Sequence, residues 1–209
     1  MTEESGRPVP SRVAQQERSR VTRRRLLEAA LDTLSDDGFP ATTVSAVAAR
    51  AGVSRGAAQH HFPTRDSLVE AALEEFFSER TQQLRRSVAD LSTGSNGAPV
   101  TEVLELVFGF FSNRPFHAAL HIWAAASTDA SLRELIIPAE ARYGREVYQL
   151  TGLALNADLS DQRTRRLLGL TLDVARGLGL GSVLVDTRSH QRSALETWSA
   201  ILADIKRND

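Results

Sequence analysis

Residues 43–62 read TVSAVAARAGVSRGAAQHHF, and this stretch decides the fold. Its first part carries apolar residues at the spacing of one helix face, namely Val44, Val47, Ala48 and Ala51. Gly52 then suits a tight turn, because glycine accepts a positive φ without a Cβ clash. Ser54 can cap a second, short helix that ends near His60 and His61. Two helices joined in this way form a helix-turn-helix, whose second helix enters the DNA major groove; a plain packing hairpin is the alternative.

Helical periodicity extends in both directions from this stretch. Upstream, an apolar stripe predicts a helix that Gly38 ends, and its members are Leu27, Ala30, Leu31 and Leu34. Downstream, Pro63 breaks the chain before a long helix over about 65–91, and residues 92–99 have the composition of a loop. Further helical stripes continue to the C-terminus, with a kink expected at Pro138. No segment alternates like a strand, so the sequence predicts an all-α fold of about nine helices.

The wider N-terminal sequence resembles a known family. The string RRRLLEAALDTLSDDGFPATTVSAVAARAGVSRGAAQHHFPTRDSLVEAAL resembles the N-terminal domain of the TetR family of transcriptional regulators. The matching landmarks are Ala29-Ala30, Gly38-Phe39, Thr43, Val47-Ala48, Ala51-Gly52-Val53-Ser54, Gly56, His61-Phe62 and Leu68. The resemblance covers about residues 20–75, and the rest of the chain matches only in its helical layout.

The resemblance implies a domain organisation and a function. Residues 1–17 are expected to be a flexible arm, 18–65 a helix-turn-helix DNA-binding domain, and 66–209 a ligand-sensing and dimerisation domain. The implied function is a ligand-responsive, sequence-specific transcriptional regulator, specifically a repressor. A homodimer would bind a pseudo-palindromic double-stranded operator and leave it when a small apolar or amphipathic effector binds.

Composition bounds the function further. Residues 1–65 hold ten Arg and seven acidic residues, whereas the net charge of the whole chain is −1, so the positive charge gathers at the N-terminal end. The chain has no cysteine, which excludes disulfides and thiolate metal sites. The first residues contain no signal-peptide core and no apolar run approaches a membrane span, so we expect a cytoplasmic protein.

The resemblance assigns DNA contacts around the helix-turn-helix. The predicted contact residues are Thr43, Ser54, Arg55, Gly56, Ala57, Gln59, His60, His61 and Arg65. Thr43 and Ser54 stand at helix N-termini, which favour phosphate, although both also serve as plain N-caps. Arg55 can pair with guanine or contact phosphate alone, and Ala57 is small enough to meet a thymine methyl. Arg65 lies where the family often has a basic phosphate contact.

Ala58-Gln59 departs from the family, which usually has Leu-Tyr there with the Tyr on the DNA backbone. Gln59 could read adenine or hydrogen-bond a phosphate, so the operator cannot be transferred from a relative. His60 and His61 either contact phosphate or pack against the helix. The N-terminal arginines, among them Arg12 and Arg18, could enter the minor groove or form a solvated cluster.

Aromatic residues gather in the second half of the chain. Together with neighbouring polar side chains they predict a small-molecule cavity, for which the candidate residues are Phe108, Phe111, Phe116, His117, Leu120, His121, Trp123 and Tyr143. An aromatic stripe at helical spacing can equally be core. His117 and His121 share one helix face, but no third ligand stands nearby, so we predict no metal and no cofactor.

The last two helices are the predicted dimer interface, as the resemblance implies. The eighth helix carries Gly169, Gly177, Gly179 and Gly181, which suggests closely packed backbones or a helix that loosens. The predicted interface residues are Leu178, Leu184, Trp198, Ile201, Leu202 and Ile205.

Two other function classes remain as alternatives. The chain could be a helical small-molecule-binding protein without specific DNA recognition. It could also be a small helical enzyme that uses His117 or His121 as a base, but the sequence has no accompanying nucleophile and orienting group. We therefore predict that it is not an enzyme.

Overall fold

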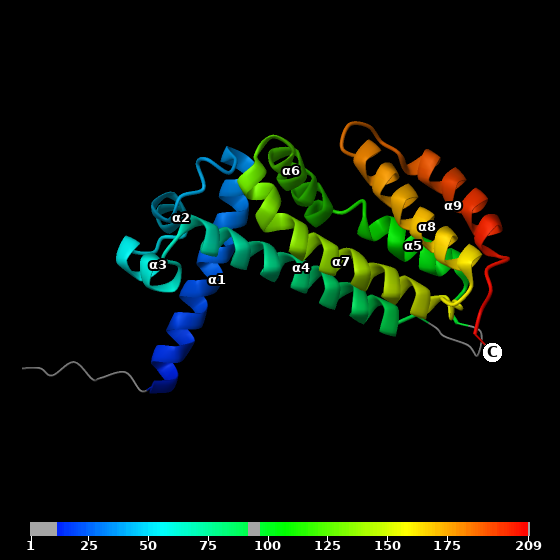
Figure 1. Ribbon diagram of the computed structural model, residues 1–209, viewed down its shortest axis with the longest axis horizontal. Coiled ribbons are helices and arrows are strands. Elements are labelled where there is room, and N and C mark those ends of the chain that lie inside the picture. The colour runs from blue at the N-terminus through cyan, green and yellow to red at the C-terminus, as the bar shows by residue number, and fades with distance from the viewer. Residues whose placement is uncertain (1–11, 92–96, 209) are drawn as a thin grey trace, which may run out of the picture. The chain divides into compact units, whose positions relative to one another are not determined.

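A computed structural model describes residues 12–91 and 97–208 of the chain (Figure 1). The described residues form nine α-helices and no strand beyond one isolated antiparallel bridge, which confirms the predicted all-α fold. The helices are α1 Arg12–Asp37, α2 Val44–Arg50, α3 Arg55–His61, α4 Arg65–Ala89, α5 Val100–Phe110, α6 Arg114–Thr128, α7 Ala130–Ala154, α8 Gln162–Gly181 and α9 Arg188–Leu202.

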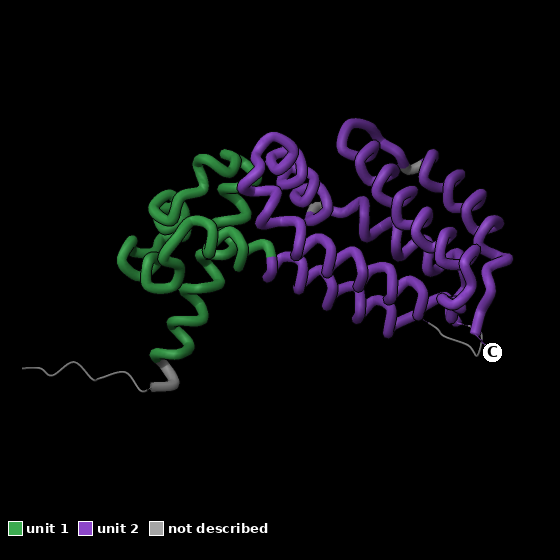
Figure 2. Tube along the Cα trace, viewed as in Figure 1, with its two compact units in different colours: residues 1–73 green, residues 74–209 purple. Residues whose placement is uncertain are grey.

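The chain divides into two compact units, residues 1–73 (unit 1) and 74–209 (unit 2), as Figure 2 shows. The division falls inside α4, eight residues beyond the end of the DNA-binding domain expected at residue 65. The reason is that Leu68 and Ala72, in the first two turns of α4, belong to the core of unit 1. The helix α4 is therefore part of both units.

The start of α1 corrects the expected flexible arm. Residues 12–17 are helical, whereas the sequence predicted an arm over 1–17; residues 1–11 lie outside the described part. Gln15, Gln16 and Glu17 are good helix formers, and an exposed helical extension needs no apolar stripe to reveal it. Arg18 and Arg20 lie on this exposed part of α1.

The core of unit 1 joins all four of its helices. It consists of Leu26, Leu27, Ala29, Ala30, Val47, Ala48, Ala58, Phe62, Leu68 and Ala72. Ala48, where α2 crosses its neighbours, is 2% exposed, so its small side chain allows close packing. Gly38 follows α1 with a φ of 81°, and Gly52 lies between α2 and α3 with a φ of 65°, as expected of both glycines. The α2–α3 pair is thereby fixed on α1 and α4.

Unit 2 is built around α5, which is buried along most of its length and contacts α7, α8 and α9. The helix α6 begins at Arg114, directly after its N-cap Asn113, whose side chain caps it, with Pro115 in the first turn. The helix α7 continues through Pro138 to Ala154, and α8 ends at Gly181. At the far end, Lys206 forms a 2.8 Å ion pair with Asp158, which lowers the pKa of that carboxyl.

Candidate nucleic-acid interface and ligand cavity

The α2–α3 pair has the geometry of a helix-turn-helix. The turn is closed by a 2.9 Å hydrogen bond in which the Val53 N–H donates to the Ala48 carbonyl. Gly52 has open space where a Cβ would stand, so its positive φ alone requires glycine there. This turn sets the angle at which α3 leaves α2 and so directs the outer face of α3 to solvent.

Both predicted N-caps are present. The Thr43 hydroxyl accepts from the Ala46 N–H at 3.1 Å, and the Ser54 hydroxyl accepts from the Ala57 N–H at 3.3 Å. Thr43 and Ser54 are also exposed, so each hydroxyl keeps access to a partner outside the chain. Capping and phosphate contact are therefore compatible at both positions.

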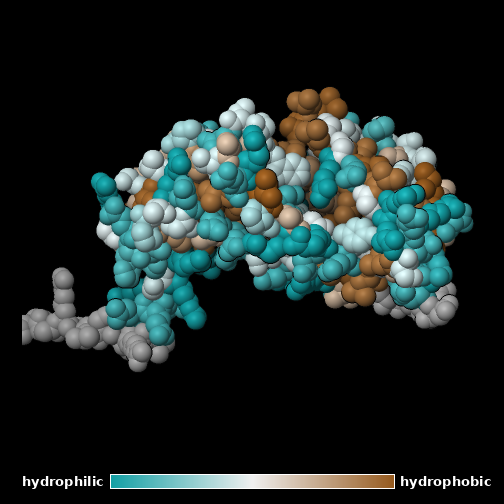
Figure 3. All heavy atoms as spheres, viewed as in Figure 1, coloured by the Kyte–Doolittle hydropathy of each residue, from teal (hydrophilic) through white to brown (hydrophobic). Residues whose placement is uncertain are grey.

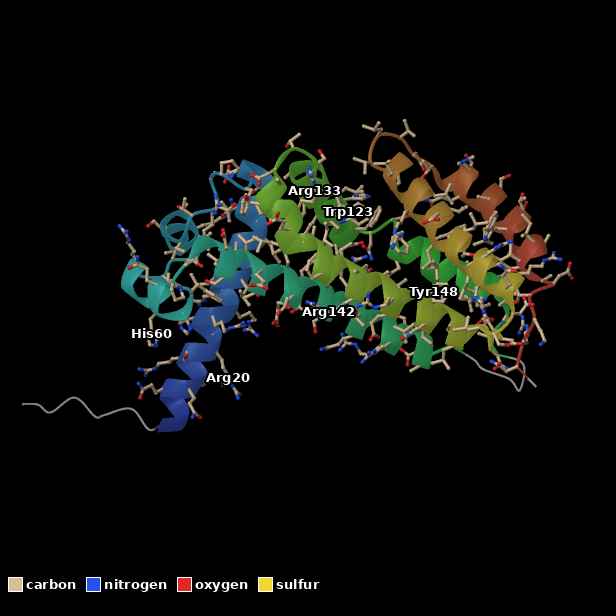
Figure 4. All side chains as sticks on the ribbon, viewed as in Figure 1. Arg20, His60, Trp123, Arg133, Arg142 and Tyr148 are labelled. Atoms are coloured by element: carbon tan, nitrogen blue, oxygen red, sulfur yellow. The ribbon has the colours of Figure 1, made fainter. Side chains whose placement is uncertain are left out.

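The helix α3 has one buried and one exposed face. Ala58 and, at its C-cap, Phe62 are buried in the core of unit 1. The exposed residues of α3 are Arg55, Gly56, Gln59 and His60, the last labelled in Figure 4. Ala57 is half-buried, which reduces the surface that it could offer to a thymine methyl. Among the exposed residues, the side chains of Arg55, Gln59 and His60 can bind nucleic acid. The buried residues hold the helix in place on the core.

His61 is half-buried and packs against its neighbours, whereas His60 is exposed. His61 is half-buried, with its ring centroid 5.8 Å from that of His60 and 6.3 Å from that of Phe62. Burial and the positive charges of His60 and Arg23 lower the pKa of His61. The packing interpretation therefore fits His61, and the exposed His60 is the histidine available to an outside partner.

Two arginines near the helix-turn-helix have intrachain partners that the sequence did not reveal. The Arg65 guanidinium lies 3.9 Å from the centroid of the Phe39 ring, and its Nε is 3.2 Å from Asp66. Arg50 forms an ion pair with Asp36 and another, at 3.4 Å, with Asp37, which joins α2 to the end of α1. In contrast, Arg55 has no ion pair among the described residues. Arg55 is thus the cation of α3 that is available to an outside partner.

In unit 2 the predicted ligand residues are mostly core. Phe108, Phe111, Phe116 and Tyr143 are each at most 5% exposed. His117 and Leu120 are half-buried, His121 is exposed, and the His117 Nε2 lies 3.3 Å from the Ser182 hydroxyl. Among the described residues no group of three possible metal ligands gathers around these histidines or elsewhere.

A cavity of about 490 Å³ opens between α6 and α7, and of the predicted ligand residues only Trp123 lines it. Its lining consists of Trp123, Ala126, Ser127, Arg133, Ile136, Ile137, Glu140 and Ala141. The size is in the range of small-molecule sites. Figure 4 labels Trp123 and Arg133 on the two helices that form it. Tyr143 instead lines a separate groove between α4 and α7.

Buried charged atoms of unit 2, of which only those of Glu140 line this cavity, were missed by the sequence analysis. Arg80 is 3% exposed, and the Glu140 Oε2 and the Arg176 Nε are buried without a hydrogen-bond partner. A signal was present in α4, where Arg80 occupies the apolar stripe that Phe77 and Leu84 define. A charged residue that lies within the apolar stripe of a helix faces the core and is therefore expected to be buried.

The structure separates the predicted dimer residues into three groups by their exposure in the single chain. Leu202 and Ile205 are at most 6% exposed within the single chain, so they belong to its core and offer no surface to a partner. Trp198 and Leu178 are half-buried, and the Trp198 indole donates a 2.9 Å hydrogen bond to Thr171 of its own chain. Leu184 and Ile201 are exposed at 87% and 38%. The difference in exposure arises because one side of the α9 stripe faces the chain's own α5 and α8.

Further apolar residues on and after α8 are exposed, and the sequence analysis did not select them. They are Leu170, Leu180, Val183 and Val185. Figure 3 shows the most apolar part of this surface at the connection between α8 and α9. Gly177 is exposed on the same helix with open space around its Cβ position, whereas a Cβ on Gly179 would meet Phe111 and Phe116.

Comparisons with known proteins agree with this geometry. A family model described as bacterial regulatory proteins of the tetR family matches residues 26–72. The chain is 31% identical over 175 residues to the HTH-type transcriptional regulator CymR of Pseudomonas putida, covering 83% of this chain and 85% of that protein. It is 32% identical over 121 residues to the regulator BetI of Cronobacter sakazakii, covering 55% of this chain and 58% of BetI.

Solved structures share the fold at lower identity. A transcriptional regulator from Pseudomonas aeruginosa superposes with a TM-score of 0.67 at 22% identity, covering 92% of this chain and 93% of that chain. A regulator from Saccharomonospora viridis, solved in complex with choline, has a TM-score of 0.60 at 18% identity, covering 89% and 98%. No described helix of the chain is long and apolar enough to span a membrane.

Proposed function

Because this chain belongs to the tetR family of bacterial regulatory proteins and is therefore a DNA-binding transcriptional regulator, we propose that it is a repressor released from its operator by a small molecule. Unit 1 reads the DNA, two copies of the chain bind together, and unit 2 binds the effector. A protein that binds the bacterial chromosome would act in the cytoplasm.

The exposed face of α3 is the observation that carries this proposal. Arg55 and Gln59 project from a helix whose opposite face is locked into a core by Ala58 and Phe62. Arginine and glutamine are the side chains that pair with guanine and adenine in the major groove. A rigid helix that presents these two groups to solvent, with no intrachain ion pair on Arg55, suits base reading better than structural packing.

The remaining proposed contacts surround this reading face. Thr43 and Ser54 would bind phosphate through their hydroxyls and the adjacent helix N-termini. His60 would add a phosphate contact from the exposed side. Arg65 would both pack on the Phe39 ring and contact a phosphate, because the packing fixes the direction in which its guanidinium can approach the DNA.

Dimerisation would use the exposed apolar surface of α8 and the following loop. Leu170, Leu180 and Leu184 are each at least 50% exposed in the single chain, and large exposed apolar groups in one region indicate a partner surface. A second copy related by a two-fold axis would place two α3 helices on successive major grooves, ~34–36 Å apart.

The effector would act through α4, because this helix belongs to both units. A molecule that favours one position of α4 in unit 2 changes the separation of the two reading helices in a dimer. Solved structures of this fold include one with choline and one, the multidrug binding protein EbrR, with proflavin, which supports a small-molecule input. Couplings of ~1–3 kcal/mol between two such sites are typical.

A two-way titration tests the proposed release. The operator affinity of the full chain is measured with and without a compound that raises its melting temperature, and the compound's affinity is measured with and without operator. Release requires both affinities to fall by the same factor, about 5- to 150-fold. If every stabilising compound binds free and DNA-bound protein equally, the sensing function is wrong, while DNA binding itself stands.

A further inference from the structure

Three polar atoms of unit 2 are buried without a hydrogen bond of full geometry. They are the Trp123 Nε1 of α6, the Glu140 Oε2 of α7 and the Arg176 Nε of α8. Two of them are N–H donors, and the third is a carboxyl oxygen. Leaving such a group buried and unpaired destabilises the fold, and it does so more strongly where the group is charged. The Trp123 N–H reaches Glu140 closely enough to lower the pKa of that carboxyl, but not with the geometry of a full hydrogen bond. A polar group from elsewhere could therefore complete the hydrogen bonding of all three atoms.

Arg80, on α4, adds a buried positive charge to the interior of unit 2. Its three hydrogen bonds go to neutral oxygens: the Tyr143 hydroxyl at 3.2 Å, the Asn113 side chain at 3.3 Å and the Phe110 carbonyl at 3.1 Å. Its guanidinium also lies 4.4 Å from the centroid of the Phe110 ring. No carboxylate of the described residues comes within 4.0 Å of it. Such a buried cation lacks the ion pair that normally accompanies it.

Both guanidiniums reach α7 within about one turn of Glu140. Arg80 bonds Tyr143, three residues along α7, and the Arg176 Nη2 lies 3.7 Å from the Cβ position of Gly144. Neither arginine is within ion-pair distance of Glu140, and the nearest ion pair of Arg176 is a 3.5 Å contact with the exposed Asp173. We call Arg80, Glu140 and Arg176 the α7 charge cluster. It holds two cations for one carboxyl group.

The cluster adjoins the cavity between α6 and α7. Glu140 belongs to both, whereas Arg80 and Arg176 line separate grooves. The other walls of the cavity include Trp123, Ala126, Ile136 and Ile137. A molecule with an apolar body could therefore lie against these walls and place its head group at the cluster. Burial raises the pKa of Glu140, with the two arginines and Trp123 opposing the rise only in part.

The unpaired atoms discriminate between possible head groups. An ammonium group could satisfy the Glu140 oxygen, but it would leave the Arg176 N–H unpaired and the Trp123 N–H with only its imperfect contact to Glu140, and it would add a third cation to the cluster. A carboxylate accepts from both N–H groups and supplies the missing negative charge. Two carboxyl groups that meet share one proton, so Glu140 in its protonated form would donate to the ligand.

We propose that unit 2 binds an amphipathic molecule through a single carboxylate, which accepts hydrogen bonds from Trp123 and Arg176 beside Arg80 and Glu140, while its apolar body fills the cavity between α6 and α7. This assignment names the effector class and so rests on the proposed sensing function. It excludes organic cations as the preferred ligands of this site.

Calorimetric titration of the full-length chain with matched compounds tests the head group. The probes are phenylacetate, hydrocinnamate, octanoate and cyclohexylacetate, each beside the primary amine and the primary alcohol of the same skeleton. At least one carboxylate should bind about 10-fold or more tightly than both of its analogues, because hydrogen bonds to charged groups contribute about 1.5–3 kcal/mol. Equal or tighter binding of the amines, or no carboxylate binding at millimolar concentration, overturns the proposal.

Two variants and a control locate the head group. Arg176→Met should lower the carboxylate affinity about 10-fold and leave the alcohol unchanged. Glu140→Gln should retain carboxylate binding, because the amide N–H replaces the shared proton. Arg163→Met, an exposed arginine on the same helix, is the matched control and should have no effect. An unchanged affinity in folded Arg176→Met, judged by circular dichroism, contradicts the site.

The DNA readout separates the two proposals. A carboxylate that binds at the cluster without weakening operator binding would leave the ligand assignment intact and contradict the proposed release. A compound of another class that releases operator, in a protein that binds no carboxylate, would support release and overturn the assignment.

Discussion

Arg55 is exposed on the reading face of α3, without an ion pair among the described residues. We predict that Arg55→Ala weakens the preferred operator by ~1–3 kcal/mol, because a bidentate contact to guanine is lost. Binding to a random duplex should change little. Fluorescence anisotropy with both duplexes at one salt concentration measures the difference. An equal loss on both would make Arg55 a phosphate contact.

Arg65 should behave differently, because its guanidinium lies on the Phe39 ring at the start of α4. We predict that Arg65→Ala weakens operator and random duplex by the same factor and reduces the salt dependence of both. It should also lower the melting temperature slightly, since an exposed cation–π contact contributes about 0.5–1 kcal/mol. Arg24→Ala, another exposed arginine of unit 1, is the control for stability. A loss confined to the operator would contradict this role.

The features of single residues that could be predicted from the sequence are those that depend on the residue itself or on its near neighbours in the chain. Gly38 and Gly52 were predictable because a positive φ depends on the glycine itself, and Thr43 and Ser54 because an N-cap bonds residues three positions away. The contact between Arg65 and Phe39 was not, because it joins residues that only the folded unit brings together.

At the scale of helices, α8 offers a matched pair of glycines with opposite surroundings. A Cβ on Gly179 would clash with the Phe111 carbonyl and stand 2.7 Å from the Phe116 ring, whereas Gly177 has open space. We predict that Gly179→Ala lowers the free energy of unfolding by about 1–3 kcal/mol. Gly177→Ala should be neutral or stabilising by up to about 1 kcal/mol, since alanine favours helix. Chemical denaturation measures both, and similar values for the two would contradict the packing of α8 on α5 and α6.

Helix positions were more predictable than the cavity that they form. Periodic apolar stripes predicted most of the helices, because a helix that packs on a core must bury one face, whereas the short α3 was predicted from its N-cap. The same stripes did not locate this cavity, since Phe108, Phe111 and Phe116 are buried in the core while the cavity lies against Ile136 and Ile137. Which apolar residues remain accessible depends on how three helices meet, and no single helix pattern contains that information.

At the scale of the whole molecule, the exposed apolar residues of α8 predict an assembly. Leu180 is 58% exposed and has no other evident role, so we predict that Leu180→Glu gives a folded monomer. Trp198 is a poorer test, because its hydrogen bond to Thr171 supports its own chain. Leu153→Glu, at a position on α7 that is 70% exposed, is the control. Sedimentation velocity measures the outcome, and a dimeric Leu180→Glu would place the interface elsewhere.

Selection of bound duplexes from a random DNA pool tests the central claim most directly. The purified full-length chain is incubated with the pool, and the retained sequences are read after several rounds. Specific reading by two copies of α3 predicts an inverted repeat whose half-sites are centred about one helical turn, or a small multiple of it, apart. The same selection with Arg55→Ala should lose information at one position in each half-site. Enrichment of no sequence, or of a motif without two-fold symmetry, would contradict the account.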